Sequence, residues 1–183
     1  MERIAAFKQS LARASALQAK GDFDGALDII SEMRAAWPGN AHLHVLWAEL
    51  VQLQETPTHS LNDAKLALQN AMALDPRFAA GAVELAYFLD NVEDTPRGAD
   101  KVFEEAARVA RRSLIEAQIG QAKSLIQIGK KKAALACLLE ALELSHADKS
   151  DGNFAAEVDQ MLDELLISDS PANGHAQKVT AKA

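Results

Sequence analysis

Residues 21–40 read GDFDGALDIISEMRAAWPGN, and this stretch alone indicates an amphipathic helix whose two ends are marked. Its apolar and small side chains recur at spacings of three and four residues, at Phe23, Ala26, Leu27, Ile30 and Met33. Gly21 precedes this stripe and Pro38-Gly39 follows it, and neither residue type continues a helix without cost. The stretch therefore predicts one helix with a turn on either side.

The segment before it has the same periodicity and predicts a second helix. Its apolar stripe consists of Ile4, Phe7, Leu11, Ala14 and Leu17. Two amphipathic helices joined by a glycine turn form a helical hairpin.

This hairpin pattern recurs along the chain. Alanines 35 to 38 residues apart open the second helix of each pair, at Ala26, Ala64, Ala99 and Ala134. A bulky apolar residue follows four positions later, at Ile30, Leu68, Phe103 and Leu138. The partner helices carry small residues at Ala14, Ala48, Ala86 and Ala122. A period of this length predicts stacked helix pairs, because each pair buries its apolar side against the next.

Several phrases of the sequence resemble the tetratricopeptide repeat. Residues 21–27 and 129–135 look like its inter-helix turn and second helix, and residues 71–76 (AMALDP) look like its closing phrase. The likeness covers roughly residues 7–147. It implies an all-α fold, a right-handed superhelical solenoid of about four helix-turn-helix hairpins within residues 1–148. The units are expected at about 7–40, 41–78, 79–114 and 115–148.

The sequence departs from the family pattern at defined places. The family's tryptophan in the first helix is replaced by Ser10, His44, Ala82 and Gln118. Units three and four have Arg111 and His146 where the first two have a closing proline, so their helices either run on or turn differently. The second unit carries about four extra residues within residues 54–59, after which Ser60 and Asp63 are expected to cap a new helix. Thr95-Pro96 is expected to start another helix in the same way.

The C-terminal part is predicted to be a cap followed by a tail. Apolar residues recur at helical spacing at Phe154, Val158, Met161, Leu162 and Leu165. Since a repeat array exposes an apolar surface at its open end, residues 149–167 are expected to form a capping helix there. In residues 168–183 only Val179 is a sizeable aliphatic residue, which predicts a disordered tail.

Composition argues against several function classes. The formal net charge is −7, whereas nucleic-acid binders usually carry a basic surplus. No apolar run approaches the roughly 20 residues of a membrane span, so no membrane insertion is expected. Cys137 is the only cysteine, which rules out an intrachain disulfide and favours a cytoplasmic protein.

Neither a catalytic centre nor a metal or cofactor site is expected. His42 and His44 are two residues apart, so on a helix they point about 200° from one another and do not share a metal ion. Cys137 has apolar sequence neighbours, which raise the pKa of a thiol rather than activate it. There is no Gly-rich phosphate-binding motif. The chain is therefore expected not to be an enzyme.

The family resemblance implies a binding role for the first helix of each pair. In that family these helices line a concave groove that receives a peptide or helix of a partner. The matching positions are Lys8, Leu11, Ser15, His42, Val45, Leu46, Glu49, Val83, Glu84, Tyr87, Ile119 and Lys123. We therefore expect a non-catalytic scaffold or adaptor. The alternative for this surface is that the chain's own long first helix or tail fills it.

The expected partner follows from the charges at these positions. Some family members grip the acidic C-terminus of a chaperone with Lys, Asn and Arg side chains. This chain has Leu11, Ser15, Leu46, Ala80 and Glu84 at the matching places, so such a tail is not expected to bind. A partner with apolar anchors and some basic residues fits better. A second hypothesis is homo-oligomerisation through the apolar ends of the array.

Overall fold

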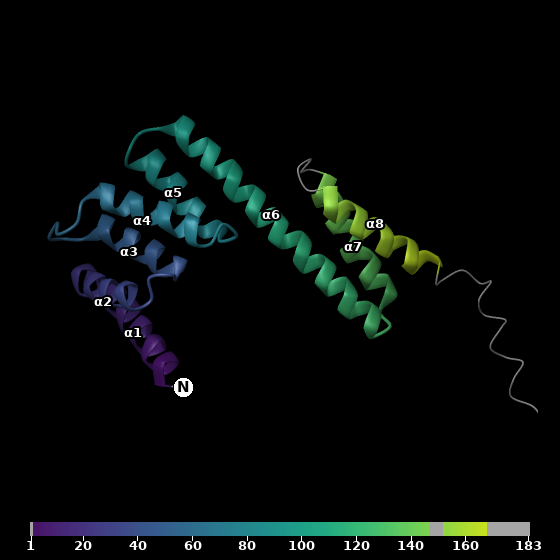
Figure 1. Cartoon of the computed structure of the whole chain (residues 1–183), viewed down its shortest axis with the longest axis horizontal. Coiled ribbons are helices and arrows are strands. Elements are labelled where there is room, and N and C mark those ends of the chain that lie inside the picture. The colour runs from purple at the N-terminus through teal and green to yellow at the C-terminus, as the bar shows by residue number, and fades with distance from the viewer. Residues whose placement is uncertain (1, 147–151, 168–183) are drawn as a thin grey trace, which may run out of the picture. The chain divides into compact units, whose positions relative to one another are not determined.

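A computed structural model describes residues 2–146 and 152–167, and within them the ordered structure is helical throughout (Figure 1). The helices are α1 (Glu2–Gln18), α2 (Phe23–Ala36), α3 (Ala41–Leu53), α4 (Leu61–Leu74), α5 (Ala79–Asn91), α6 (Pro96–Gln127), α7 (Lys131–His146) and α8 (Gly152–Ile167). The predicted all-α fold is confirmed. The predicted tail, residues 168–183, lies outside the described residues.

The chain divides into two compact units, Met1–Val109 and Ala110–Ala183. The division falls inside α6, so the first part of this helix belongs to one unit and the rest belongs to the other.

The first unit is a stack of helical hairpins. Each helix from α1 to α4 packs against the next, α4 packs against α5, and α3 also contacts α5. The repeated alanines lie at these seams, since Ala26, Ala48, Ala64 and Ala86 are fully buried. Their small side chains let neighbouring helices approach closely. Larger side chains such as Ile30 fill the remaining space in the core.

The helix ends in this unit follow from local side chains. The Asp22 carboxylate accepts a hydrogen bond from the Gly25 backbone N–H at 2.9 Å and caps α2. Ser60 and Asp63 form the expected reciprocal capping box at the start of α4. Gly21 adopts a φ of +83°, a conformation that favours glycine, in the turn between α1 and α2.

The long helix α6 shows what happens in the third unit, where the sequence lacks a closing proline: the helix runs on. It contains 32 residues and runs through 114 and 115, where the third and fourth units were expected to meet. Pro38 and Pro76 follow the ends of α2 and α4, whereas Arg111 stands at the matching place in α6 and continues the helix. Pro96 is the first residue of α6, as expected, and the Thr95 hydroxyl donates to the Leu89 carbonyl at 3.0 Å.

The second unit has its own core, formed by the C-terminal part of α6 together with α7 and α8. Ile115 and Ile119 of α6, Leu138 of α7 and Val158 of α8 are among its buried residues. Residues 152–167 of the predicted capping segment form helix α8, which packs on α7.

Candidate functional site

The positions predicted to line a groove can be placed helix by helix in the first unit. On α3 and α5, which contact one another, Leu46, Glu49, Val83, Glu84 and Tyr87 retain exposed surface. We call these five residues the first-helix face. Lys8 and Ser15 on α1 and His42 on α3 are also exposed.

Two carboxylates lie close enough on this face to affect one another. Burial raises the pKa of the Glu49 carboxyl, and the negative charge of Glu84 raises it further. Among the described residues neither carboxylate has a hydrogen-bond or ion-pair partner. The first-helix face therefore holds two neighbouring acidic groups that lack a counter-charge.

Apolar groups flank this acidic pair. Tyr87 is 51% exposed, which is high for a large aromatic side chain, and one part of its ring packs against Phe103 of α6 at a centroid distance of 5.1 Å. Leu46 and Val83 are half-buried, and Leu46 packs partly against the core. The first-helix face thus combines the exposed ring of Tyr87, which packs against Phe103, with the two carboxylates of Glu49 and Glu84.

The remaining predicted positions are buried or make contacts within their own unit. Val45 and Ile119 are only 3% and 4% exposed and belong to the cores of the first and second unit, because their helices are covered on more than one side. Lys123 lies in the second unit, where its ammonium group forms an ion pair with Glu157 of α8 at 2.9 Å. Leu11 on α1 is half-buried and packs against the core of the first unit.

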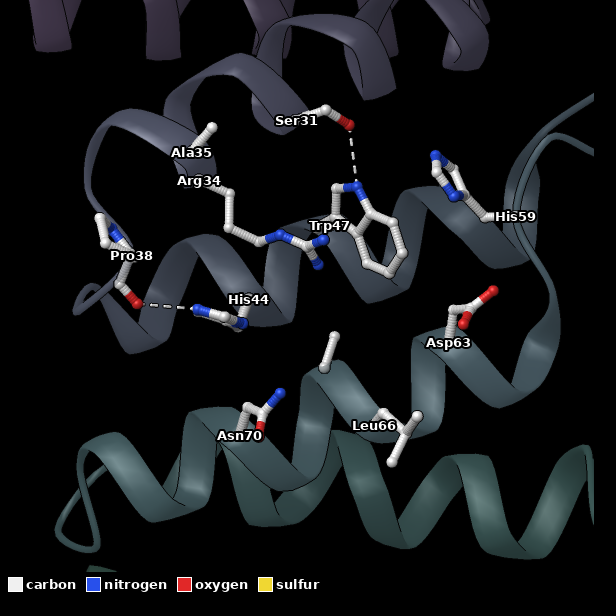
Figure 2. Close-up of a pocket in the computed structure, with 11 residues that line it drawn as sticks. Ser31, Arg34, Ala35, Pro38, His44, Trp47, His59, Asp63, Leu66 and Asn70 are labelled. Atoms are coloured by element: carbon white, nitrogen blue, oxygen red, sulfur yellow. Dashed lines mark hydrogen bonds between the residues drawn. The ribbon is translucent and has the colours of Figure 1, made fainter.

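An open pocket lies on the opposite side of α3. It has a volume of about 490 Å³ and lies between α2 and α4, with part of α3 and the α3–α4 connection in its walls (Figure 2). His44 and Trp47 of α3 line it, whereas Leu46 and Glu49 belong to the first-helix face. Residues 44 and 47 point roughly 170° from the stripe of residues 42, 46 and 49, because a helix turns by about 100° per residue.

Trp47 is the centre of this pocket. Its indole Nε1–H donates to the Ser31 hydroxyl of α2 at 2.9 Å. The Arg34 guanidinium lies over the indole ring, 3.7 Å from the centroid, and the His59 ring meets it edge-on at 4.8 Å. Figure 2 shows Arg34, Trp47 and His59 side by side along one wall, with Asp63 of α4 across from His59.

The connection between α3 and α4 is held in place by side chains at both ends. The Gln54 side-chain oxygen accepts from the backbone N–H groups of Thr58 and His59 at 2.8 and 3.2 Å, and its amide donates to the His59 carbonyl at 2.7 Å. The Asp24 carboxylate of α2 accepts from the backbone N–H groups of residues 55–56 at 3.0 and 3.2 Å. These bonds position the His59 ring on Trp47.

No protein-family model matches this sequence, and no curated protein matches it either. Among solved structures, a crystal structure of MamA protein is similar. The similarity spans 87% of this chain and 86% of that chain, with a TM-score of 0.47 and 18% sequence identity. A second crystal structure of MamA has a TM-score of 0.44 and 16% identity over 85% of this chain and 88% of that chain. Both are similarities in helix arrangement, and neither assigns an activity or a partner to this chain.

The Arg34–Trp47 pocket was not predicted from the sequence, although the extra residues within 54–59 contribute to its wall through His59. His44 also lines the pocket. Its Nε2–H donates to the Pro38 carbonyl at 3.0 Å, which fixes the ring at the pocket margin.

Within the part of the chain that the structure describes, no cluster of three or more His, Cys, Asp or Glu side chains is arranged to hold a metal ion. No helix in residues 2–146 or 152–167 is long and apolar enough to cross a bilayer.

Proposed function

We propose that this chain is a non-catalytic, cytoplasmic scaffold of the tetratricopeptide type. Its first-helix face binds a peptide or helix of another protein that carries an apolar anchor and a basic side chain. The observation that carries this proposal is the Glu49–Glu84 pair beside the exposed ring of Tyr87.

The acidic pair supports a basic partner on electrostatic grounds. Two neighbouring carboxylates repel one another, and partial burial makes the charge on Glu49 more costly. A Lys or Arg side chain placed between them would relieve both effects, because it supplies the missing counter-charge. Charge complementarity of this kind also raises the association rate and selects among partners.

Tyr87 supports an apolar anchor on the same partner. Tyrosine is enriched at interaction hot spots, because it gives a large contact area for little loss of conformational entropy. Its contact with Phe103 limits the motion of the ring before binding. A basic residue and an apolar residue about one helical turn apart on the partner would match Glu84 and Tyr87, which are three residues apart on α5.

The test compares proteins captured from a cell lysate by the immobilised wild-type chain and by three variants, with quantification by mass spectrometry. The first variant, Glu49→Gln with Glu84→Gln, removes the acidic pair, and the second, Tyr87→Ala, removes the exposed ring. The control, Glu104→Gln with Leu139→Ala, changes one exposed acidic residue and one exposed large apolar residue outside the face.

Proteins captured by the wild type should fall at least tenfold with the first two variants and be retained by the control. A tenfold loss corresponds to about 1.4 kcal/mol of binding free energy. Far-UV circular dichroism should be the same for all four proteins. Equal capture by wild type and the acidic-pair variant would refute the proposal.

A second candidate function, homo-oligomerisation, is favoured by exposed apolar residues of the second unit. Ile128, Leu166 and Ile167 are 64%, 58% and 65% exposed. An open cavity of about 260 Å³ lies nearby, lined by Ile126 and Leu165 among others. Apolar surface left open at the end of a repeat array is suited to pairing with another copy.

A further inference from the structure

Arg34 is an unusual cation in the first unit. Its side chain is half-buried between α2 and α3, and its guanidinium forms no hydrogen bond or ion pair with the residues that the structure describes. Most half-buried cations in proteins have a carboxylate partner, because burial of an unpaired charge is costly. Burial lowers the pKa of the Arg34 guanidinium, and the more distant Asp63 carboxylate only partly opposes this effect.

The stacking on Trp47 leaves the binding groups of Arg34 available. One flat side of the guanidinium lies on the indole, 3.7 Å from its centroid, which gives a favourable cation–π contact. The N–H donors of a guanidinium project from its edges, in the plane of the group. Trp47 itself is held by Ser31 through its indole N–H, so the stacked pair is fixed before a ligand arrives.

The pocket around this pair selects for one negative charge. Asp63 is the acidic residue in its lining, and its carboxylate already accepts hydrogen bonds from the Ser60 backbone N–H and hydroxyl at 2.9 and 2.7 Å. A ligand with several negative charges would be repelled by Asp63, whereas a single charge can lie at the Arg34 side. The lining contains no lysine and no second arginine, which a phosphate group would favour.

We propose that the Arg34–Trp47 pocket binds the carboxylate of a single Glu or Asp side chain on a segment of a partner protein. A planar guanidinium and a carboxylate match in a two-bond geometry, and this pairing is more specific than a contact with a lysine. The volume of about 490 Å³ lies within the range of natural ligand pockets and accommodates the side chain with its neighbouring peptide groups. Asn70 on α4 provides a further amide for those groups (Figure 2).

This site lies on the face of α3 opposite the first-helix face. Its proposed ligand is negatively charged, whereas the proposed ligand of the first-helix face is positively charged. The chain would therefore bind a basic side chain on one side of α3 and an acidic one on the other. Since the two sites share no residue, a failure of either proposal leaves the other open to its own test.

The experiment titrates the full chain, labelled with ¹⁵N, with a capped peptide Ac-Gly-Ala-Glu-Ala-Gly-NH₂, and records the Trp indole and Arg Nε–H signals by NMR. The chain has two tryptophans, so Trp37→Phe assigns the Trp47 indole signal. The same peptide with Gln in place of Glu, and inorganic phosphate, are titrated in parallel. The variants are Arg34→Gln, Arg34→Lys and, as a matched control, Arg97→Gln, which changes an exposed arginine of α6.

We expect the Glu peptide to shift the Trp47 and Arg34 signals with saturation, and the Gln peptide to bind at least tenfold more weakly. Arg34→Gln should abolish the shifts, Arg34→Lys should weaken binding at least threefold, and Arg97→Gln should bind as the wild type does. Circular dichroism checks the fold of each variant; if Arg34→Gln does not fold, Arg34→Lys decides. Equal shifts with both peptides, saturation by phosphate alone, or unaltered affinity in the variants that fold would overturn the proposal.

Discussion

The ionised carboxylate of Glu49 opposes folding, although the same charge is proposed to bind a basic side chain of a partner. Its carboxyl is half-buried next to Glu84 and has no cation beside it in the described part of the chain. The folded chain therefore holds a proton at this site more tightly than the unfolded chain does. As a result, ionisation of Glu49 opposes folding at neutral pH, and this cost disappears when the carboxyl is protonated.

We predict that Glu49→Gln makes the protein more stable than the wild type at pH 7. The difference should shrink as the pH falls through the raised pKa of Glu49 towards its ordinary value of about 4.5, because the wild-type carboxyl is then neutral too. Urea denaturation of both proteins between pH 4 and pH 7 measures this difference. Glu104→Gln, at an exposed position on α6, serves as the control for the loss of one surface carboxylate. A wild type that is more stable than Glu49→Gln at pH 7 would contradict the prediction.

Helical phase assigned Glu49, Glu84 and Tyr87 to the groove, and in the structure all three retain exposed surface on neighbouring helices. Val45, which helical phase also assigned to the groove, is buried, because α3 is covered by α2, α4 and α5 and therefore buries more of its circumference than a single stripe. The contact between Arg34 and Trp47 joins two helices, and periodicity within either helix carries no information about it.

At the level of elements, the start of α4 depends on a short capping sequence. The Ser60 hydroxyl accepts from the Asp63 backbone N–H at 3.2 Å, and the Asp63 carboxylate accepts from the Ser60 backbone N–H at 2.9 Å. Hydrogen bonding to Ser60 also lowers the pKa of the Asp63 carboxyl.

Ser60→Ala is predicted to lower the free energy of unfolding by about 1 kcal/mol, the usual effect of losing an N-cap. The matched control is Ser124→Ala. The Ser124 hydroxyl donates to the Gly120 carbonyl within α6, and Ala favours a helix interior, so the control should be neutral or slightly stabilising. Chemical denaturation of both variants provides the comparison, and equal losses would show that the cap contributes nothing of its own.

The element boundaries were predictable where a proline or a capping side chain marks them. The ends of α2 and α4 precede Pro38 and Pro76, and the start of α4 follows the expected capping pair. The sequence around Arg111 has no such marker, so only the structure shows that α6 continues through it.

The continuity of α6 is predicted to appear in amide hydrogen exchange. Backbone amides of residues 109–115 should exchange as slowly as those in the flanking turns of α6, because each donates within the helix. Exchange measured by mass spectrometry or NMR tests this directly. The turn at residues 128–130, which follows α6, gives the fast-exchanging reference. Fast exchange confined to residues 111–114 would instead indicate two separate helices.

For the whole molecule, the number of chains per particle tests the proposed homo-oligomerisation. A mass of one chain at all concentrations tested would exclude it. Assembly through the second unit would instead give a mass that rises with concentration. Leu166→Gln with Ile167→Gln, at exposed positions of α8, should reverse that rise if these residues form the contact. Analytical ultracentrifugation measures both proteins.

Helix α2 carries three side chains that build the Arg34–Trp47 pocket. Asp24 anchors the α3–α4 connection, and Ser31 accepts the hydrogen bond of the Trp47 indole N–H. Arg34 is the cation that lies over the indole ring. The acidic pair is carried by α3 and α5 alone. Loss of the first hairpin would therefore remove the cation of the proposed carboxylate site and leave both members of the acidic pair in the chain.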